Sequence, residues 1–166
     1  MNKLVYFCHK IYEALEEGKD VCFVSLDASA AFDRVWHIGL LFKLRQIGVG
    51  GMLYRWIESY LSNRRQRVVI NGQTSEWTNI TAGVPQGSIL GPLLFLIYID
   101  DIICDIESEI MLFADDTCLF EKVDCPLDSI AKLNRDLSRL NNWALQWLVT
   151  FNPGKTKFMV FSKKLL

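Results

Sequence analysis

The sequence predicts an α+β fold in which an antiparallel sheet is backed by helices. Residues 21–27 form a short β-branched and aromatic run, which is typical of a buried strand. Residues 110–120 contain two apolar runs joined by two adjacent aspartates, a pattern that predicts a β-hairpin. From Leu127 to Trp147 the apolar residues recur at steps of three and four, which predicts a helix with one face on a core.

Length and composition narrow the class of protein. The chain has 166 residues, enough for one domain with its own core. A hydrophobic content of 51% excludes a disordered chain, and a net charge of −1 gives no overall electrostatic sign of nucleic-acid binding. The five cysteines show neither zinc spacing nor a disulfide framework, which predicts a reduced, intracellular protein. No signal peptide is visible and the longest apolar stretch, 89–99, is too short for a membrane span, so we expect a soluble protein.

The first third of the chain predicts a helix, a strand and then further helices. Apolar residues recur at helical spacing through residues 3–17, and the predicted strand follows. It ends at Asp27, and residues 28–33 form a turn into a helix. An aspartate at a strand end can bind a ligand or cap the next helix, and its position leaves both open. Two more helices are expected at 40–47 and 52–61.

Residues 64–80 predict a second β-hairpin, because Asn71 and Gly72 lie between two β-like runs. A basic cluster opens this segment. Such a cluster is either a solvated edge or a contact to a phosphate backbone, and the sequence leaves both open. The cluster consists of Arg64, Arg65 and Arg67.

Residues 81–92 form a glycine-rich loop that lets backbone approach a ligand closely, although a purely structural turn would look the same. Gln86 in this loop offers amide donors and an acceptor, which suit a sugar or base edge. Ser88 can cap an apolar helix that runs to about Ile103.

Asp115 and Asp116 lie at the tip of the hairpin predicted over 110–120. Two aspartates can form an ordinary polar turn, but carboxylates at the end of apolar strands also suit Mg²⁺, which prefers oxygen ligands. Asp100 and Asp101 form a similar pair, yet they close a helix, so we expect them at its exposed end. We therefore favour Asp115 and Asp116 over Asp100 and Asp101 as the metal site.

The last part of the chain predicts a loop at 152–157 and a final strand at 158–161. Gly154-Lys155-Thr156 is similar to part of a phosphate loop. The glycine that this loop requires five residues earlier is Val149, and a strand follows instead of a helix, so we reject a nucleotide hydrolase.

Three stretches occur together and in order: 23–33 (FVSLDASAAFD), 82–92 (AGVPQGSILGP) and 113–116 (FADD). The ordered set strongly resembles the reverse transcriptase palm of non-LTR (LINE-type, jockey-like) retrotransposons, and the similarity covers nearly the whole chain. It implies a polymerase palm over residues 1–166 with a partial fingers hairpin at about 64–80. A lysine that relatives often carry three residues after the first aspartate is Ala30 here.

The resemblance implies a metal site. Asp27 matches the first metal-binding aspartate, Asp115 the second, and Asp116 their neighbour in the catalytic pair. The implied cofactor is a pair of Mg²⁺ ions, with Mn²⁺ as an alternative ion. The chemistry agrees, because joining a 3′-hydroxyl to an α-phosphate needs two metals about 3.5–4 Å apart and carboxylates from different parts of the chain.

The resemblance also implies nucleotide contacts. Phe32 matches the bulky side chain that excludes a ribose 2′-hydroxyl. Lys155 matches a lysine near the leaving pyrophosphate, where it can act as a general acid. The residues that match contacts to the incoming nucleotide, besides Phe32, are Ala28, Pro85, Gln86 and Gly87.

We therefore expect an RNA-directed DNA polymerase core that extends a DNA primer on an RNA template with deoxynucleotides and has no membrane partner. The upstream fingers and the downstream thumb and endonuclease are missing from the chain, so we expect a fragment or decayed copy of a polyprotein that acts in the nucleus. The first alternative is an inactive or domesticated copy that only binds nucleic acid or protein. The second is a relative such as a group II intron maturase or an RNA-templated RNA polymerase, and the bulky Phe32 argues against the use of ribonucleotides. The third is a Mg²⁺ phosphohydrolase.

Overall fold

The computed structural model describes residues 3–113 and 116–163. The chain divides into two compact units, each described here by itself. The first, called the sheet unit, comprises residues 1–29, 102–146 and 150–166. The second, called the helical unit, comprises residues 30–101 and 147–149.

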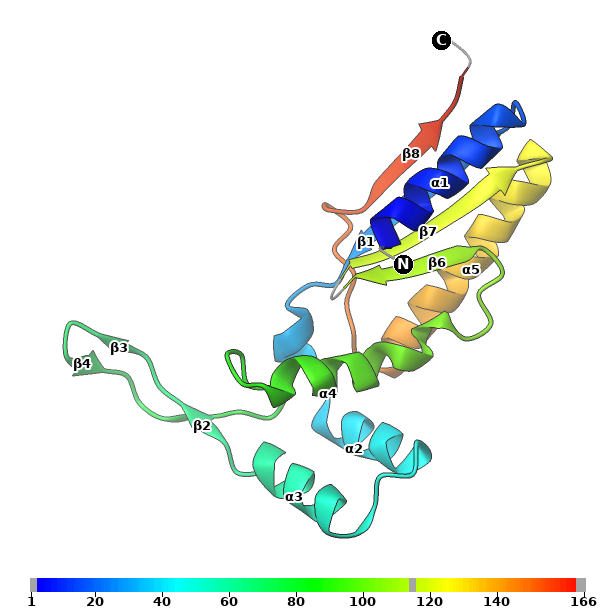
Figure 1. The fold of residues 1–166 in the computed structure, drawn as a ribbon. Coiled ribbons are helices and arrows are strands. Elements are labelled where there is room, and N and C mark those ends of the chain that lie inside the picture. The colour runs from blue at the N-terminus through cyan, green and yellow to red at the C-terminus, as the bar shows by residue number, and fades with distance from the viewer. Residues whose placement is uncertain (1–2, 114–115, 164–166) are drawn as a thin grey trace. The chain divides into compact units, whose positions relative to one another are not determined.

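The sheet unit is built on a four-stranded antiparallel sheet with the strand order β6-β7-β1-β8 (Figure 1). Helices α1 and α5 complete it. The predicted antiparallel sheet, its central hairpin and its long C-terminal helix are confirmed. The elements are α1 (Lys3–Glu16), β1 (Asp20–Asp27), β6 (Glu109–Phe113), β7 (Asp116–Val123), α5 (Pro126–Gln146) and β8 (Lys157–Phe161).

The two faces of this sheet are covered by different helices, as Figure 1 shows. Alternate side chains of β1 point to opposite faces. Val24 and Leu26 join the core that Leu133 and Leu140 of α5 complete. Phe23 and the other residues of odd number in β1 face α1, whose Phe7 ring lies 5.1 Å from the Phe23 ring.

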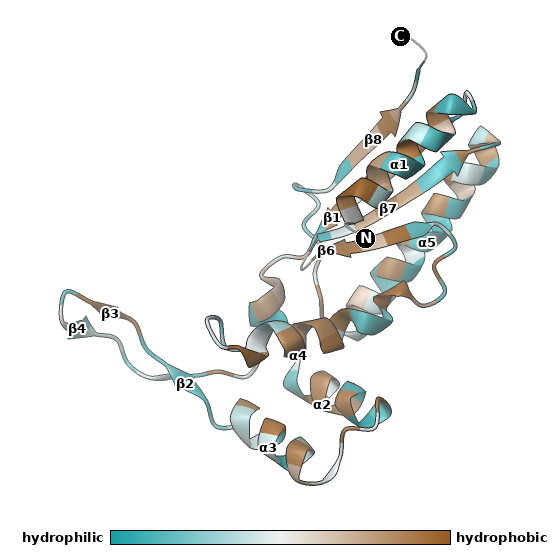
Figure 2. Ribbon diagram, viewed as in Figure 1, coloured by the Kyte–Doolittle hydropathy of each residue, from teal (hydrophilic) through white to brown (hydrophobic). Residues whose placement is uncertain are grey.

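The helical unit contains three α-helices, a short 3₁₀ helix and a two-stranded ribbon. Its α4 is apolar around nearly its whole circumference (Figure 2). No described helix is both long and apolar enough to cross a membrane. The elements are η1 (Ala31–Arg34), α2 (His37–Gln46), α3 (Gly51–Leu61), β2 (Arg65–Gln66), β3 (Val69–Ile70), β4 (Gln73–Thr74), β5 (Thr78–Asn79) and α4 (Leu90–Ile99).

The ribbon β2–β5 confirms the predicted turn at Asn71 and Gly72 and adds a bulge. Val69 pairs with Thr74 across the turn, whereas Arg65 pairs with Asn79, so the register shifts by one residue between the two ladders. The extra residue lies in the 75–77 segment of the returning strand. A bulge of this kind increases the local twist of a ribbon.

Two helix boundaries differ from the sequence prediction. The helix expected to run to Ile103 ends at Ile99 and continues as the 3₁₀ helix η2 (Asp100–Ile103). The segment after Asp27 forms the 3₁₀ turn η1, and Ala30 immediately before it adopts a left-handed φ of 50°.

Candidate active site

Asp27 and Asp116 lie directly opposite each other in the sheet. They are the terminal pair of the β1–β7 ladder, where Asp27 ends β1 and Asp116 begins β7. Residues that face each other across an antiparallel pair point to the same side, with Cβ atoms about 4.5–5.5 Å apart. The sheet therefore presents two carboxylates side by side at one end of a single face.

The two strands of the hairpin, β6 and β7, agree with the prediction. Phe113 at the end of β6 pairs with Asp116, so residues 114–115 connect the two strands. Asp115, the predicted second metal ligand, lies outside the described residues. Its assignment stays a prediction.

The face that carries the two aspartates is shared with α1, but at the other end of the strands. Helix α1 packs at Phe23 and Phe120, which lie four residues along their strands from Asp27 and Asp116. The Asp27 side chain is 22% exposed, and Asp116 is exposed. Both carboxylates are thus open to a ligand.

The loop that precedes β8 brings Lys155 to the same place. The backbone N–H of Asn152 donates to the carbonyl of Asp27 at 2.8 Å, and Ser29 N–H donates to the carbonyl of Thr150 at 2.8 Å. The turn then closes as Lys155 N–H bonds back to the carbonyl of Asn152. As a result, Lys155 Nζ lies 3.2 Å from Asp27 Oδ1.

The alternative that Asp27 caps a helix does not hold, because the N-cap position of η1 is Ala30. Asp27 instead faces one carboxylate and one ammonium group. Like charges directly opposite each other in a sheet are destabilising, so this pair favours a cation between its oxygens. Oxygen ligands of this kind suit a hard divalent ion.

The described part of the chain brings two carboxylates together at this end of the sheet. It contains no cluster of three His, Cys, Asp or Glu side chains placed to hold an ion. The pair formed by Asp27 and Asp116 supplies two ligands, and Mg²⁺ is commonly bound by one or two carboxylates together with substrate phosphates and water. These residues therefore fit the predicted ion without a third side chain.

The predicted nucleotide contacts, apart from Ala28, lie in the helical unit. Phe32 stacks on Phe95 with ring centroids 4.5 Å apart, which fixes the ring beside η1. Ala28 is in the sheet unit, where it is buried and bridges to Phe151. Its role stays a prediction.

The loop that carries Gln86 is joined to the turn that carries Phe32. Val84 N–H donates to the carbonyl of Phe32 at 2.8 Å, and Gly83 N–H to the carbonyl of Val35 at 2.8 Å. Gly83 has a φ of 88°, and a Cβ there would come within 2.7 Å of the carbonyl oxygen of Asp33. Only glycine permits this approach, so the two segments pack closely and form one piece joined by backbone hydrogen bonds.

A cavity of about 600 Å³ opens beside that piece. Gln86 lines it, and its Nε2 donates to Asp33 Oδ1 at 2.8 Å. The other lining residues come from η1, the base of the ribbon and the loop before α4. They are Asp33, Arg64, Gln66, Asn79, Ile80, Thr81, Ala82, Gly83, Val84 and Pro85.

The predicted basic cluster is divided between this cavity and the ribbon. Arg64 lines the cavity. The guanidinium groups of Arg65 and Arg67 lie 5.8 Å and 4.7 Å from the ring centroid of Trp77, which is 54% exposed. An exposed indole beside arginines is a surface on which a nucleobase can stack.

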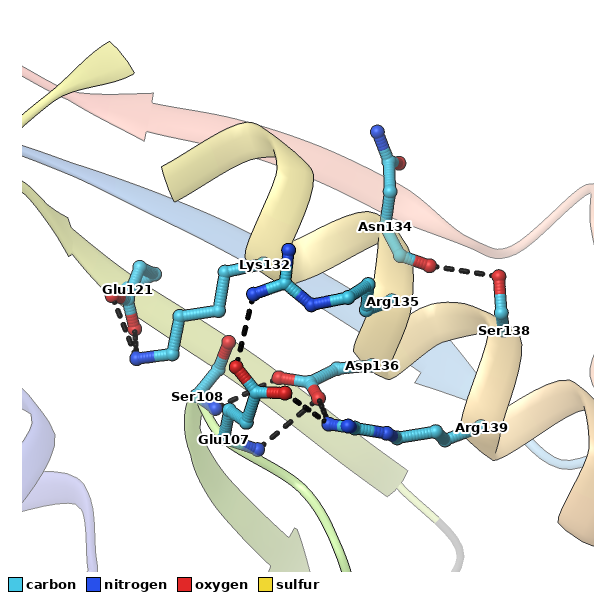
Figure 3. Close-up of polar contacts among 9 residues, drawn as sticks. All are labelled: Glu107, Ser108, Glu121, Lys132, Asn134, Arg135, Asp136, Ser138 and Arg139. Atoms are coloured by element: carbon cyan, nitrogen blue, oxygen red, sulfur yellow. Dashed lines mark hydrogen bonds and ion pairs between the residues drawn. The ribbon is translucent and has the colours of Figure 1, made fainter. Parts of the chain in front are cut away.

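Asp136, a residue that the sequence analysis missed, holds the start of the hairpin formed by β6 and β7. Its side chain is fully buried at 0% exposure. Asp136 Oδ1 and Oδ2 accept hydrogen bonds from the backbone N–H groups of Glu107 and Ser108, at 3.1 and 2.8 Å (Figure 3). Arg139 Nη1 lies 2.9 Å from Asp136 Oδ1. These bonds fix the chain just before β6.

The charge of Asp136 is maintained by its partners. Burial alone would raise its pKa, but the hydrogen bonds from Ser108, Glu107 and Arg139 outweigh burial and hold the pKa below its ordinary value. The sequence contained a signal for this residue. Asp136 lies three residues after Leu133 and four before Leu140, so it occupies the apolar face of α5.

The second aspartate pair, Asp100 and Asp101, lies at the start of η2, directly after α4. Asp100 is exposed after α4, as expected. Asp101 is half-buried and forms an ion pair with Lys43, whose Nζ also donates to the carbonyl of Tyr98 at 2.6 Å. The expectation of an exposed helix end was therefore wrong for Asp101, because the buried Lys43 needs a counter-ion.

A model of the family described as reverse transcriptase (RNA-dependent DNA polymerase) matches residues 4–165. The chain is 34% identical over 161 residues to the RNA-directed DNA polymerase from mobile element jockey of Drosophila funebris. It is also 34% identical over 165 residues to the probable RNA-directed DNA polymerase from transposon X-element of Drosophila melanogaster. These matches cover 92% and 94% of this chain, and the chain spans only 18% of either relative.

Solved structures give a consistent result for the fold. Telomerase from Candida tropicalis, solved with the TWJ fragment of telomeric RNA, matches 96% of this chain with a TM-score of 0.68 and 12% identity. Telomerase from Candida albicans matches 98% with a TM-score of 0.68 and 14% identity. The matches cover 29% and 31% of those chains. At such low identity the similarity shows the fold alone.

Proposed function

This chain belongs to the reverse transcriptase family, and from that premise we propose that it is the palm of an RNA-directed DNA polymerase of a non-LTR retrotransposon. The observation that carries the proposal is the pair formed by Asp27 and Asp116 on one face of the sheet. Because the chain spans 18% of its relatives, the fingers, thumb and endonuclease belong to the polyprotein in which the palm acts.

Members of this family use divalent metal ions, and we propose Mg²⁺ held by Asp27, Asp116 and Asp115. When bound, two such ions would strengthen the attacking 3′-hydroxyl as a nucleophile and stabilise the leaving oxygen. Mn²⁺ has the same preference for oxygen ligands and would serve as an alternative.

Lys155 supports the departure of pyrophosphate. Its ammonium group, 64% exposed, lies 3.2 Å from Asp27 Oδ1 and therefore stands beside the proposed reacting centre. A lysine at this place neutralises charge that develops on the leaving group and can donate a proton to it. No covalent intermediate on the protein is needed, because phosphoryl transfer depends mainly on position and charge.

Deoxynucleotide use follows from Phe32. Its ring is held against Phe95 and cannot easily move away from an added 2′-hydroxyl. The alternatives that use ribonucleotides are disfavoured for the same reason. Gln86, Pro85 and Gly87 supply further contacts to the nucleotide.

The ribbon is proposed to contact the RNA template. Arg65 and Arg67 can bind phosphates, and the exposed ring of Trp77 near both guanidinium groups can stack on a base. In the full-length element this activity belongs in the nucleus, where the DNA target lies.

Primer extension tests the proposal. We would give the protein an RNA template, a DNA primer, deoxynucleotides and Mg²⁺, and compare it with its Asp115→Asn and Asp27→Asn variants. Each variant is expected to lose extension by at least about a hundredfold, because a metal-binding charge is removed. Asp100→Asn is the matched control, since Asp100 is an exposed aspartate outside the proposed site.

Equal extension by the wild type and Asp27→Asn would contradict the proposal. If the wild type binds the primer–template without extending it, the alternative of an inactive copy that only binds nucleic acid is favoured.

A further inference from the structure

We propose that Asp33 is a positioning residue that orients the side-chain amide of Gln86 and so makes Gln86 a hydrogen-bond acceptor toward the bound nucleotide. The inference rests on the proposed function, because it assigns a role at the same nucleotide site. It adds a residue and a direction of hydrogen bonding that the sequence did not indicate.

The direction follows from the chemistry of the two side chains. An ionised carboxylate has only acceptor atoms, whereas a glutamine amide has a donor end and an acceptor end. Gln86 Nε2 lies 2.8 Å from Asp33 Oδ1, so the amide nitrogen must face Asp33. Gln86 Oε1, on the other branch of the same planar group, is then directed away from Asp33.

The backbone around this pair keeps the orientation fixed. Val84 N–H donates to the carbonyl of Phe32, the residue before Asp33. The carbonyl of Gly83 lies 2.7 Å from His37 Nε2, which adds a second link between the loop and the chain after η1. Asp33 and Gln86 thus belong to two segments that are joined at both sides of their contact.

Both side chains line the cavity of about 600 Å³, so their hydrogen bond lies on a surface that a ligand can reach. Cavities of about 300–1,000 Å³ accommodate small ligands such as a nucleotide. Arg64 on the same cavity offers a positive charge to a phosphate.

The ligand group that Gln86 recognises must be a donor. The triphosphate of a nucleotide is ionised and only accepts hydrogen bonds. The donors on the Watson–Crick edge of the base are used by the template. The donor that all four paired deoxynucleotides keep is the 3′-hydroxyl, which makes it the expected partner of Gln86 Oε1.

The test uses three variants of the protein in primer extension. Asp33→Ala removes the partner, and Gln86→Glu sets two carboxylates against each other; each should raise KM for deoxynucleotides about tenfold with kcat nearly unchanged. The double variant Asp33→Asn/Gln86→Glu restores the bond with its polarity reversed, since the asparagine amide now donates to the glutamate. It should return KM to within about threefold of the wild type.

Recovery of KM in the double variant distinguishes a positioning role from a structural one. The double variant contains neither original side chain, but it again directs a hydrogen-bond acceptor toward the nucleotide. The pair is exposed, so none of the variants should unfold the protein. A wild-type KM in Asp33→Ala, or a folded double variant no better than Gln86→Glu, overturns the proposal.

Dideoxynucleotides identify the donor. If Gln86 accepts from the 3′-hydroxyl, Asp33→Ala should weaken use of the deoxynucleotide more than that of its 3′-deoxy analogue. An equal loss for both would overturn the 3′-hydroxyl as the partner of Gln86 Oε1.

A readout without catalysis keeps this inference separate from the proposed function. In ¹⁵N NMR spectra, the side-chain NH₂ signals of Gln86 should shift in Asp33→Ala but not in the control Asp100→Asn, and added deoxynucleotide should shift them in the wild type. If the wild type extends no primer, the proposed function fails, while these signals still decide the role of Asp33. Signals that do not respond to Asp33→Ala overturn it.

Discussion

Asp27 and Asp116 are placed for chemistry at a cost to the stability of the sheet. They form the last pair of the β1–β7 ladder and face each other. A pair of opposite charges or of apolar side chains would stabilise the sheet at this position. The ammonium of Lys155 offsets part of the repulsion from the Asp27 side. Such local conflict is expected at functional sites.

Removing one of these charges should therefore stabilise the protein when no metal is present. We expect Asp116→Asn to raise the free energy of unfolding by about 0.2–1 kcal/mol in EDTA, because a like-charge pair is removed. Added Mg²⁺ should raise the melting temperature of the wild type but not of the variant, since only the wild type binds the ion. Thermal unfolding with and without Mg²⁺ measures both effects, with Asp100→Asn as the control. A wild type that Mg²⁺ leaves unchanged would count against the site.

Phe32 should control the choice of sugar. Phe32→Val is expected to increase kcat/KM for ribonucleotides relative to deoxynucleotides, because the space beside the 2′-position is opened. It should also cost about 1 kcal/mol of stability through loss of the ring pair with Phe95. Single-nucleotide extension with each sugar measures the ratio. Phe32→Tyr, which keeps the ring, should leave it unchanged, and a Phe32→Val enzyme that still rejects ribonucleotides would refute the role.

Single residues were predictable where they follow a pattern and not where they depend on distant partners. Asp27 is visible in the sequence because it ends an apolar strand. Asp136 is not assigned there, since its partners are backbone groups of Glu107 and Ser108, 28 or 29 residues away. The contact between Asp33 and Gln86 spans 53 residues and leaves no local trace.

At the scale of elements, side chains of α5 fix the segment just before β6. Arg135 and Arg139 pair with Glu107, while Asp136 binds the backbone beside it (Figure 3). The surface ion pairs are worth little, whereas the buried carboxylate satisfies two backbone N–H groups, those of Glu107 and Ser108. The position of the hairpin should depend mainly on Asp136.

Asp136 makes stability depend on pH with a definite sign. Its pKa is lowered in the folded protein, so its contribution is fully present above its unfolded pKa of about 3.9 and is lost as pH falls through the folded pKa. Asp136→Asn should cost about 2 kcal/mol at pH 7. The difference between wild type and variant should shrink as the pH falls below about 4, as urea unfolding would measure. A difference that stays constant with pH would exclude a charged Asp136 as the cause.

The join between η1 and the loop before α4 depends on glycine at position 83. Gly83→Ala should destabilise the protein by about 1–3 kcal/mol and raise KM for nucleotides, because the new Cβ would meet the carbonyl of Asp33. Gly50→Ala is the matched control, since a Cβ at Gly50 meets no atom within 4 Å. Urea unfolding and primer extension measure the two effects. Equal stability of the two variants would show that this approach is not required.

Elements with their own signals were predicted well. The turn at Asn71 and Gly72 and the stripe of α5 each result from local chemistry. The bulge in the ribbon and the 3₁₀ turns were not predicted. They depend on strand register and on backbone angles such as the left-handed φ of Ala30. Such features need tertiary contacts to select them.

At the scale of the whole molecule, the order of elements predicted an α+β fold, and the three ordered motifs at 23–33, 82–92 and 113–116 predicted that this fold is a polymerase palm. Neither predicted that the candidate residues divide between two units. Asp27, Asp116 and Lys155 belong to the sheet unit, whereas Phe32 and Gln86 belong to the helical unit. The chemistry of metal ions and the choice of nucleotide are thus assigned to different parts of the fold.

Mn²⁺ titration followed by NMR tests most directly whether Asp27 and Asp116 share a divalent cation. A paramagnetic ion broadens the signals of nearby amides, so the strongest loss is expected at the end of β1, at the start of β7 and at residues 150–155. Asp27→Asn should abolish this pattern, and Asp100→Asn should preserve it. Broadening that centres on Asp100 and Asp101, or that persists unchanged in Asp27→Asn, would show that Asp27 and Asp116 do not hold the ion.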